Sequence, residues 1–237
     1  MARVFVTGSS TGLGLMAAQL LLEMGHRVVV HGRNQARADV ALTAAPRADA
    51  AVIGDLSKIR DMRSVAEQVN RLGEFDAVIH NAGIGYRESR RAETEDRLPA
   101  LFATNTLAPF VLTALIGRPK RLVYLSSGMH QSARLDIDDL TWARRSWRGA
   151  EAYAETKLHD VLIAFAVARR WSGVLSNALE PGWVATRMGV SAPDTLDEAH
   201  RTQVWLAISD DPLHGERPLL LHMQLRQPNQ ITQRLSA

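Results

Sequence analysis

Two patterns of apolar residues alternate along this 237-residue chain. Short runs rich in β-branched residues are typical of buried strands, and longer stretches with apolar residues at helical spacing are typical of helices. We expect helices at Leu15–Met24, Asn34–Ala45, Lys58–Leu72, Glu93–Ile116, Glu151–Trp171 and Thr195–Ser209. We expect seven strands, at Arg3–Val6, His26–Val30, Ala50–Ile53, Asp76–His80, Arg121–Leu125, Gly173–Leu179 and Pro218–His222.

This alternation of strand and helix predicts the fold class. It is typical of an α/β protein with a parallel sheet, here of seven strands, and helices on both faces. Right-handed crossovers give such a sheet a doubly wound, Rossmann-like topology, and ligands bind beyond the carboxyl ends of its strands. No repeat, linker or change of composition divides the chain, so we expect residues 1–237 to form a single domain.

The loops expected at that edge of the sheet are rich in small and polar residues. The first of them, Thr7-Gly-Ser-Ser-Thr-Gly-Leu-Gly14, joins a strand to a helix. Glycine lets the backbone approach a ligand closely, and the N-terminus of a helix suits a pyrophosphate. One interpretation is a dinucleotide site, and the other is a tight strand–helix corner. The remaining loops are His31–Arg33, Asp55, Asn81–Gly83, Ser126–Ser127 and Pro181–Thr186.

The turn after the second strand indicates which dinucleotide is bound. In a fold of this type an acid about 20 residues past the glycines accepts the 2′-hydroxyl of NAD, whereas an arginine accommodates the 2′-phosphate of NADP. The turn here is His31-Gly-Arg33-Asn34, and no acidic residue occurs between Glu23 and Asp39. Because a guanidinium pairs well with a phosphate, we expect NADP(H) rather than NAD(H), with Arg33 as the main contact. The alternative is a solvated arginine at the start of a helix.

Tyr153 and Lys157 form a candidate acid–base pair. Residues four apart share one face of a helix, and a neighbouring cation favours the phenolate form of a tyrosine. The spacing alone is common by chance, and a lysine that extends to solvent beside a surface tyrosine fits it as well. Ser127, at the end of a strand, can hydrogen-bond a carbonyl oxygen. Asn105, in the helix before that strand, can hold a water beside the lysine.

Together these motifs resemble those of the short-chain dehydrogenase/reductase family, and the resemblance covers nearly the whole chain. Their joint order and spacing are specific, unlike any one motif alone. The shared motifs are Thr7-Gly8-x-x-x-Gly12-x-Gly14, Asp55-Leu56, Asn81-Ala82-Gly83, Asn105, Ser127, Tyr153-x-x-x-Lys157 and Pro181-Gly182-Trp183-Val184-x-Thr186.

The resemblance implies a catalytic role for four residues. Ser127, Tyr153 and Lys157 match the catalytic triad of the family, and Asn105 completes a tetrad. In the mechanism that the family implies, Tyr153 protonates the carbonyl oxygen and Ser127 hydrogen-bonds it. Lys157 assists the tyrosine and binds the nicotinamide ribose, while Asn105 maintains a water path that resupplies the proton.

The resemblance also implies a set of cofactor contacts. Asp55 would contact the adenine, Asn81 and Gly83 would flank the adenosine ribose, and Val184 and Thr186 would lie against the nicotinamide. The full set of expected cofactor-binding residues is Gly8, Ser10, Thr11, Gly12, Leu13, Gly14, Arg33, Asn34, Asp55, Leu56, Asn81, Ala82, Gly83, Tyr153, Lys157, Pro181, Gly182, Val184 and Thr186.

Two features depart from the commonest family pattern. The segment Gly128–Ala152, called the insert below, makes the interval between Ser127 and Tyr153 about twice that of many members. Such an insert is similar to the retinol dehydrogenase and protochlorophyllide reductase branch. In addition, the stretch between Thr186 and the next expected helix is short, where many relatives have a longer substrate lid. We therefore expect an open pocket with the insert as one wall, and the residues do not indicate the substrate.

The composition of the chain mainly excludes certain functions and sites. The formal net charge is +3 without a long basic run, so nucleic acid binding is not expected. The chain contains no cysteine, which excludes disulfides and thiolate metal sites, and its eight histidines show no metal-ligand spacing. The first expected strand begins at Arg3, and no apolar run is long enough to cross a bilayer. We expect a cytoplasmic protein without a metal or a membrane contact.

The helices expected at Glu93–Ile116 and Glu151–Trp171 predict a homodimer. They carry more apolar surface than one face of a sheet needs, and exposed apolar patches often mark subunit contacts. Members of the family commonly pair through these helices.

The function we expect is NADP(H)-dependent transfer of a hydride between nicotinamide and a small-molecule carbonyl or secondary alcohol. A competing function is that of a catalytically silent NADP(H)-binding regulator, but family members of that kind usually lack the tyrosine or the lysine. A sugar-nucleotide epimerase would carry a longer C-terminal substrate domain than the roughly fifty residues that follow Thr186.

Overall fold

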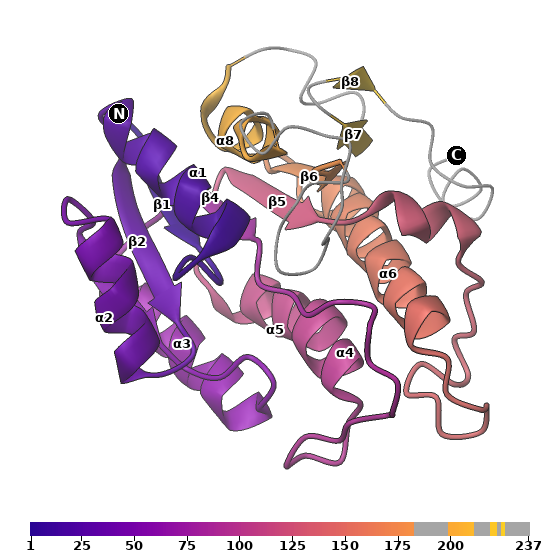
Figure 1. Ribbon diagram of the computed structural model, residues 1–237. Coiled ribbons are helices and arrows are strands. Elements are labelled where there is room, and N and C mark those ends of the chain that lie inside the picture. Colours follow the sequence, from indigo (N-terminus) through magenta and orange to yellow (C-terminus); the bar gives the residue numbers. More distant parts are fainter. Residues whose placement is uncertain (183–198, 211–218, 222–223, 226–237) are drawn as a thin grey trace.

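The computed structural model describes residues 1–182, 199–210, 219–221 and 224–225. Within them, eight strands form one sheet in the order β3-β2-β1-β4-β5-β6-β7-β8 (Figure 1). The strands are β1 Arg3–Val6, β2 Arg27–Gly32, β3 Ala50–Ile53, β4 Ala77–His80, β5 Arg121–Leu125, β6 Leu175–Glu180, β7 Leu219–Leu221 and β8 Gln224–Leu225.

The sheet is doubly wound, as the sequence predicts. Strands β1 to β7 are all parallel, and the strand order reverses between β1 and β4, where such folds bind their ligands. All seven expected parallel strands are present, and an eighth, β8, pairs antiparallel with β7 at the edge of the described sheet. With only two residues, β8 is too short to produce a pattern of alternating residues.

Helices cover both faces of the sheet, and the sheet separates the two large clusters of the core. Val4 and Val6 of β1 pack with one cluster and Phe5 with the other, because successive side chains of a strand point to opposite faces. The first cluster takes in α1 Gly12–Glu23, α2 Gln35–Ala44 and α8 Arg201–Ile208. The second takes in α3 Ile59–Arg71, α5 Ala108–Leu115 and α6 Gly149–Arg170 (Figure 1).

The helix expected over Glu93–Ile116 is wrong in its first part. Glu93 instead forms an isolated bridge with Pro99, and the helix begins just after that proline, as α4 Ala100–Phe102. A proline disfavours the helical conformation of the residue before it. Arg97 also has a left-handed φ of 59°, which no helix contains.

The remainder of that helix is interrupted by one π-helical turn, η1 Ala103–Leu107, before α5 begins. Pro109 gives a physical reason for this turn. Its nitrogen has no hydrogen to donate to the carbonyl of Asn105, four residues earlier, and its ring would clash with that carbonyl in a regular helix. Single π-turns occur frequently at functional sites, and this one contains Asn105.

Candidate active site

The end of β4 holds the glycine-rich loop between β1 and α1. Thr7 Oγ1 accepts hydrogen bonds from the backbone N–H groups of Asn81 at 3.0 Å and Ala82 at 2.9 Å. Asn81 Nδ2 donates in return to the carbonyl oxygens of Thr7 at 3.0 Å and Gly8 at 3.2 Å. Gly8 has a φ of 62°, and a Cβ there would lie 2.8 Å from the Cα of Ala82. Only glycine suits that position.

The start of α1 faces open space. Gly12 has a φ of 61°, and among the described residues no atom beyond its own stretch of backbone lies within 4 Å of the place where its Cβ would be. The side chain of Thr11 does not cap the helix, and the first turn contains no acidic residue. Among the described residues, the first N–H groups of α1 therefore have no side-chain cap, so they suit a bound anion such as a pyrophosphate.

His31 holds the same loop from β2, and sequence reasoning did not identify this role. Its Nδ1 accepts a hydrogen bond from the Gly8 N–H at 2.9 Å, so Nε2 carries the ring hydrogen and donates to the Gly54 carbonyl, also at 2.9 Å. Burial lowers the pKa of His31 to about 4, against the opposing effects of Gly54 and Asp55, which keeps the ring neutral at pH 7. The sequence feature that could have indicated this role is the position of His31 at the end of a strand, at the edge of the sheet that also carries the glycine-rich loop.

The turns after β2 and β3 contain further expected cofactor residues. Arg33 is exposed, and Asn34 Oδ1 caps α2 by accepting the N–H of Arg37 at 3.0 Å. Asp55 Oδ1 accepts the N–H of Ser57 at 3.0 Å and its hydroxyl at 2.8 Å, which orders the turn before α3. The neighbouring Leu56 is buried in the core. Arg33 is thus an exposed residue directly after the carboxyl end of β2.

Asn105 is almost fully buried, at 1% exposed, and joins three elements. Its Oδ1 accepts the N–H of Ile84 at 2.8 Å, and its Nδ2 donates to the Ile84 carbonyl at 3.0 Å and to Thr156 Oγ1 at 3.2 Å. A Cβ at Gly83 would lie 3.4 Å from Asn105 Oδ1 and 3.7 Å from Lys157 Nζ. The end of β4, the π-turn and α6 therefore meet at Gly83.

Lys157 has two buried partners. Its Nζ donates to the Leu125 carbonyl at 2.7 Å and to Asp160 Oδ2 at 2.9 Å, and lies 5.9 Å from the centre of the Tyr153 ring. Burial lowers the pKa of Lys157, but the Asp160 carboxylate and Tyr153 outweigh it, so the net pKa is raised. Burial raises the pKa of Asp160 to about 6, against the opposing effect of Lys157. Sequence reasoning did not identify Asp160, although its spacing of three places it beside Lys157 on a helix.

The two serines that follow β5, Ser126 and Ser127, differ in burial and in hydrogen bonding. Ser126 is buried, and its hydroxyl donates to the Lys157 carbonyl oxygen at 2.7 Å. Ser127 is partly exposed and begins the short 3₁₀ helix η2 Gly128–Ser132, where its Oγ accepts the Met129 N–H at 3.4 Å. The hydroxyl of Ser127, rather than that of Ser126, remains accessible to a substrate.

Tyr153 lies in an apolar cluster beside the insert. Its ring packs with buried Leu101 and Trp142, and the Tyr86 ring meets it edge-on with the centroids 5.8 Å apart. Trp147 packs against the same cluster, and its Nε1 donates a hydrogen bond to the Glu88 carbonyl at 2.9 Å. The ring of Tyr153 is therefore held by neighbours on several elements, and the insert forms an apolar wall next to it.

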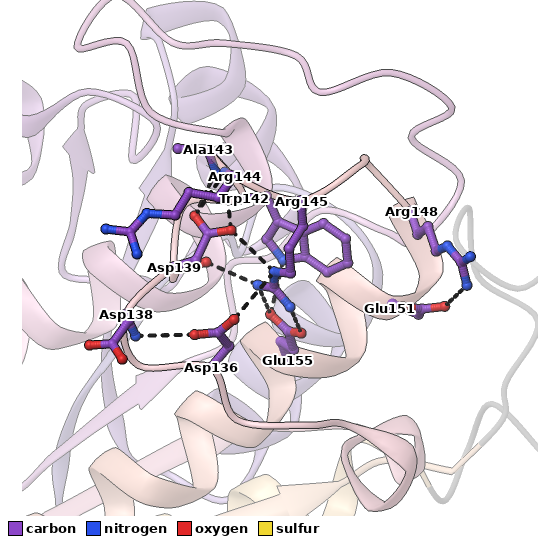
Figure 2. Close-up of polar contacts among 10 residues, drawn as sticks. All are labelled: Asp136, Asp138, Asp139, Trp142, Ala143, Arg144, Arg145, Arg148, Glu151 and Glu155. Carbon is purple, nitrogen blue, oxygen red and sulfur yellow. Dashed lines mark hydrogen bonds and ion pairs between the residues drawn. The ribbon is translucent and has the colours of Figure 1, made fainter.

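An ionic cluster attaches the insert to α6 (Figure 2). The Arg145 guanidinium donates to both carboxylate oxygens of Glu155, at 2.7 and 3.1 Å, and to Asp139 Oδ2 at 3.2 Å. It also stacks on the ring of Trp142, whose Nε1 donates to Glu155 Oε2 at 2.9 Å. Glu155 lies two residues after Tyr153 and is 4% exposed. The same helix therefore carries the candidate catalytic pair and the anchor of the insert.

The last expected cofactor residues are only partly described. Pro181 and Gly182 directly follow β6, whereas Val184 and Thr186 lie outside the described residues. In the part of the chain that the structure describes, no helix is long and apolar enough to cross a membrane. The same part contains no cluster of three histidine, aspartate or glutamate side chains suited to a metal ion.

A glycine-rich loop and a tyrosine–lysine pair lie at one edge of a doubly wound sheet, an arrangement typical of nicotinamide-dependent oxidoreductases. The family model for short chain dehydrogenases matches residues 2–122. An uncharacterised oxidoreductase of Emericella nidulans is 45% identical over 217 residues, which are 90% of this chain and 82% of that protein. The chain belongs to the short-chain dehydrogenase/reductase family and is an NAD(P)-dependent enzyme that acts on CH–OH or C=O groups.

Two further comparisons refine the relationship. Human retinol dehydrogenase 13 is 32% identical over 201 residues, which are 78% of this chain and 60% of that protein, so the expected resemblance to the retinol dehydrogenase branch is confirmed. A solved structure of an uncharacterised protein from Mycobacterium paratuberculosis matches with a TM-score of 0.82 and 26% identity, over 98% of this chain and 87% of that one. The expected resemblance to protochlorophyllide reductases stays a prediction.

Proposed function

We propose that the protein is an NADP(H)-dependent oxidoreductase that interconverts a small-molecule carbonyl compound and its secondary alcohol. One observation carries this proposal: Asn105 and Lys157 converge on Gly83, at the edge of the sheet that also carries the glycine-rich loop. A dinucleotide whose phosphates lie at Gly12 would extend along this edge toward Tyr153. We propose that the protein forms one domain and works in the cytoplasm.

The residues around the expected cofactor fit a dinucleotide. The uncapped start of α1 and the open space at Gly12 suit its pyrophosphate. We assign the adenosine end to Arg33, Asn34, Asp55 and the Asn81–Gly83 stretch. We assign the nicotinamide end to Lys157, Pro181, Gly182, Val184 and Thr186. When bound, the cofactor supplies or accepts a hydride, and the protein supplies the proton.

Four residues carry the proposed proton chemistry. Tyr153 donates its phenolic proton to the carbonyl oxygen during reduction, and Ser127 donates a second hydrogen bond to that oxygen. The Lys157 ammonium group favours the phenolate that remains, because opposite charges at short range attract. Asn105 fixes the adjacent chain through Ile84 and Thr156 and maintains a path for the returning proton.

The preference for NADP(H) rests on Arg33. An exposed guanidinium at the end of β2 pairs with the 2′-phosphate, which NADP carries and NAD lacks. Arg33→Ser should weaken NADPH binding about 10- to 100-fold, as expected for hydrogen bonds to a charged group, and leave NADH binding nearly unchanged. Fluorescence titration with both cofactors measures this, with Arg63→Ser on the exposed face of α3 as the control. Equal losses for NADPH and NADH would contradict the assignment.

A catalytically silent NADP(H)-binding regulator remains the competing function. To separate the two, the enzyme is incubated with NADPH and a panel of aldehydes, ketones and quinones, and the loss of nicotinamide absorbance is followed. Turnover of any carbonyl compound supports the oxidoreductase. Tight NADPH binding without turnover across the panel, in either direction, would favour the regulator.

We also propose that the protein is a homodimer that pairs through the exposed sides of α5 and α6. Phe110 and Leu115 of α5 are large apolar residues that are 56% and 46% exposed. Apolar side chains in solvent on a helix of this kind often mark a subunit contact. Light scattering at micromolar concentration tests the pairing, and a monomer would exclude it.

A further inference from the structure

Asp160 is a buried acid that directly contacts the lysine of the candidate catalytic pair. Its Oδ2 lies 2.9 Å from Lys157 Nζ, and the side chains of the pair are only 4% and 7% exposed. The second partner of Nζ is the Leu125 carbonyl, at 2.7 Å. An ammonium group has three hydrogens to donate. These two partners therefore leave one hydrogen, and Nζ lies beside Gly83, where the expected cofactor would pass.

Stability alone does not explain this pair. A buried ion pair loses hydration on both sides, and apolar residues of similar volume usually stabilise a core as well or better. A lysine without a counter-ion in such a site would tend to lose its proton, because burial disfavours the charged form. The Asp160 carboxylate opposes that loss and keeps the pKa of Lys157 above its ordinary value.

Few other titratable groups surround Asp160. Of the elements packed against α6, β5 contributes Arg121 and Tyr124, β6 contributes Glu180 and η2 contributes His130. Burial raises the pKa of Tyr124, which keeps that phenol neutral. Among the described groups, Lys157 is the charged residue that acts on the Asp160 carboxylate. The protonation of Lys157 is thus coupled most directly to Asp160.

We propose that Asp160 is a positioning residue for Lys157: its carboxylate keeps the buried ammonium group charged and directs the remaining N–H toward the nicotinamide side of the cofactor. This inference rests on the proposed function, in which Lys157 binds the nicotinamide ribose. It also gives Asp160 a part in cofactor affinity, although the acid lies behind the lysine and makes no contact with the ligand itself.

The test compares Asp160→Asn with Glu151→Gln. Both substitutions remove one negative charge from α6, but Glu151 is exposed and paired with Arg148 at the start of the helix. Asp160→Ser is a second variant, in which a smaller side chain avoids strain in the core. NADPH and NADH dissociation constants are measured by fluorescence from pH 7 to pH 9.5, together with kcat, KM and the thermal unfolding midpoint of each protein.

We expect Asp160→Asn to bind both cofactors about tenfold more weakly at pH 7, as for the loss of one hydrogen bond to a charged group. Its affinity should fall further as the pH rises toward 9, because the unpaired lysine then loses its proton, whereas the wild type and Glu151→Gln should stay constant. Affinities and pH profiles equal to those of Glu151→Gln would overturn the proposal. So would failure of both Asp160 variants to fold, since the acid would then be structural. Wild-type protein that binds neither cofactor would instead contradict the proposed function.

Discussion

At the scale of single residues, the proposed chemistry depends most on the hydroxyl of Tyr153. Tyr153→Phe removes that group and keeps the ring, which is packed with Leu101, Trp142 and Tyr86. Loss of a positioned acid or base typically costs about 10²- to 10⁴-fold in rate, so kcat should fall by that range while the NADPH dissociation constant changes less than about threefold. Steady-state kinetics and fluorescence titration measure the two effects.

Tyr86→Phe provides the matched control, since it removes the same hydroxyl from the neighbouring ring 5.8 Å away. This variant should keep most of its turnover. Equal turnover in Tyr153→Phe and the wild type would exclude Tyr153 as the proton donor, and equal losses in both variants would indicate a general disturbance of the apolar wall.

The sequence predicted which residues would gather at this site better than it predicted what they would contact. Asn105, Lys157 and Gly83 were expected at one edge of the sheet, and the structure brings them together there. Asp160 was missed because a spacing of three identifies a shared helix face but not whether that face is buried. His31 was missed for a related reason, since its contacts with Gly8 and Gly54 join parts of the chain 23 residues away on either side.

At the scale of elements, the insert depends on its attachment to α6. Trp142 adopts a left-handed φ of 55°, which is strained for a large side chain and persists only where neighbouring contacts enforce it. Arg145 supplies those contacts by stacking on Trp142 and binding Glu155 (Figure 2). Arg145 is therefore a central anchor of the insert, and its removal should loosen the wall beside Tyr153.

Arg145→Ala should leave the buried Glu155 carboxylate without its main partner and lower the free energy of unfolding by about 1–3 kcal/mol. It should also speed cleavage of the insert by chymotrypsin and raise KM more than it lowers kcat, because the wall moves while the acid–base pair stays. Arg148→Ala removes an exposed ion pair with Glu151 and is the control. It should leave the free energy of unfolding, the rate of cleavage and KM nearly unchanged. Identical proteolysis of both variants would show that Arg145 does not anchor the insert.

The predicted bounds of helices and strands agree with the structure where the local pattern of residues determines them. The bounds predicted for β1, β3 and β5 agree with the structure to the residue, because each is a short apolar run ended by polar or small residues. The region before Ala100 was predicted wrongly because the helical spacing outweighed Pro99. The conformation of the insert could not be predicted at all, since side chains from separate elements hold it.

At the scale of the whole molecule, buried titratable groups are distributed through the sheet and its helices. Burial lowers the pKa of His31 on β2 and His159 on α6 to about 4, and that of His80 on β4 to about 3. An unfolded chain would bind protons at these rings near pH 6.5. Their contribution to stability is therefore complete above about pH 6.5 and is lost as the pH falls toward 4. Asp160 acts in the opposite sense, since its pKa is raised and its stabilisation is lost as the pH rises through about 6.

The three histidines together should outweigh the single acid, so the free energy of unfolding should fall between pH 7.5 and pH 5, by on the order of 2 kcal/mol for each histidine before the partial offset by Asp160. Urea unfolding at several pH values measures this change. His80 stacks on Tyr124 with the ring centroids 4.8 Å apart, so His80→Phe keeps a stacked ring and removes one titration. Whatever its absolute stability, that variant should lose about 2 kcal/mol less unfolding free energy between pH 7.5 and pH 5 than the wild type, with an unchanged dependence on urea. A wild type as stable at pH 5 as at pH 7.5 would contradict the assignment of these rings as buried and neutral.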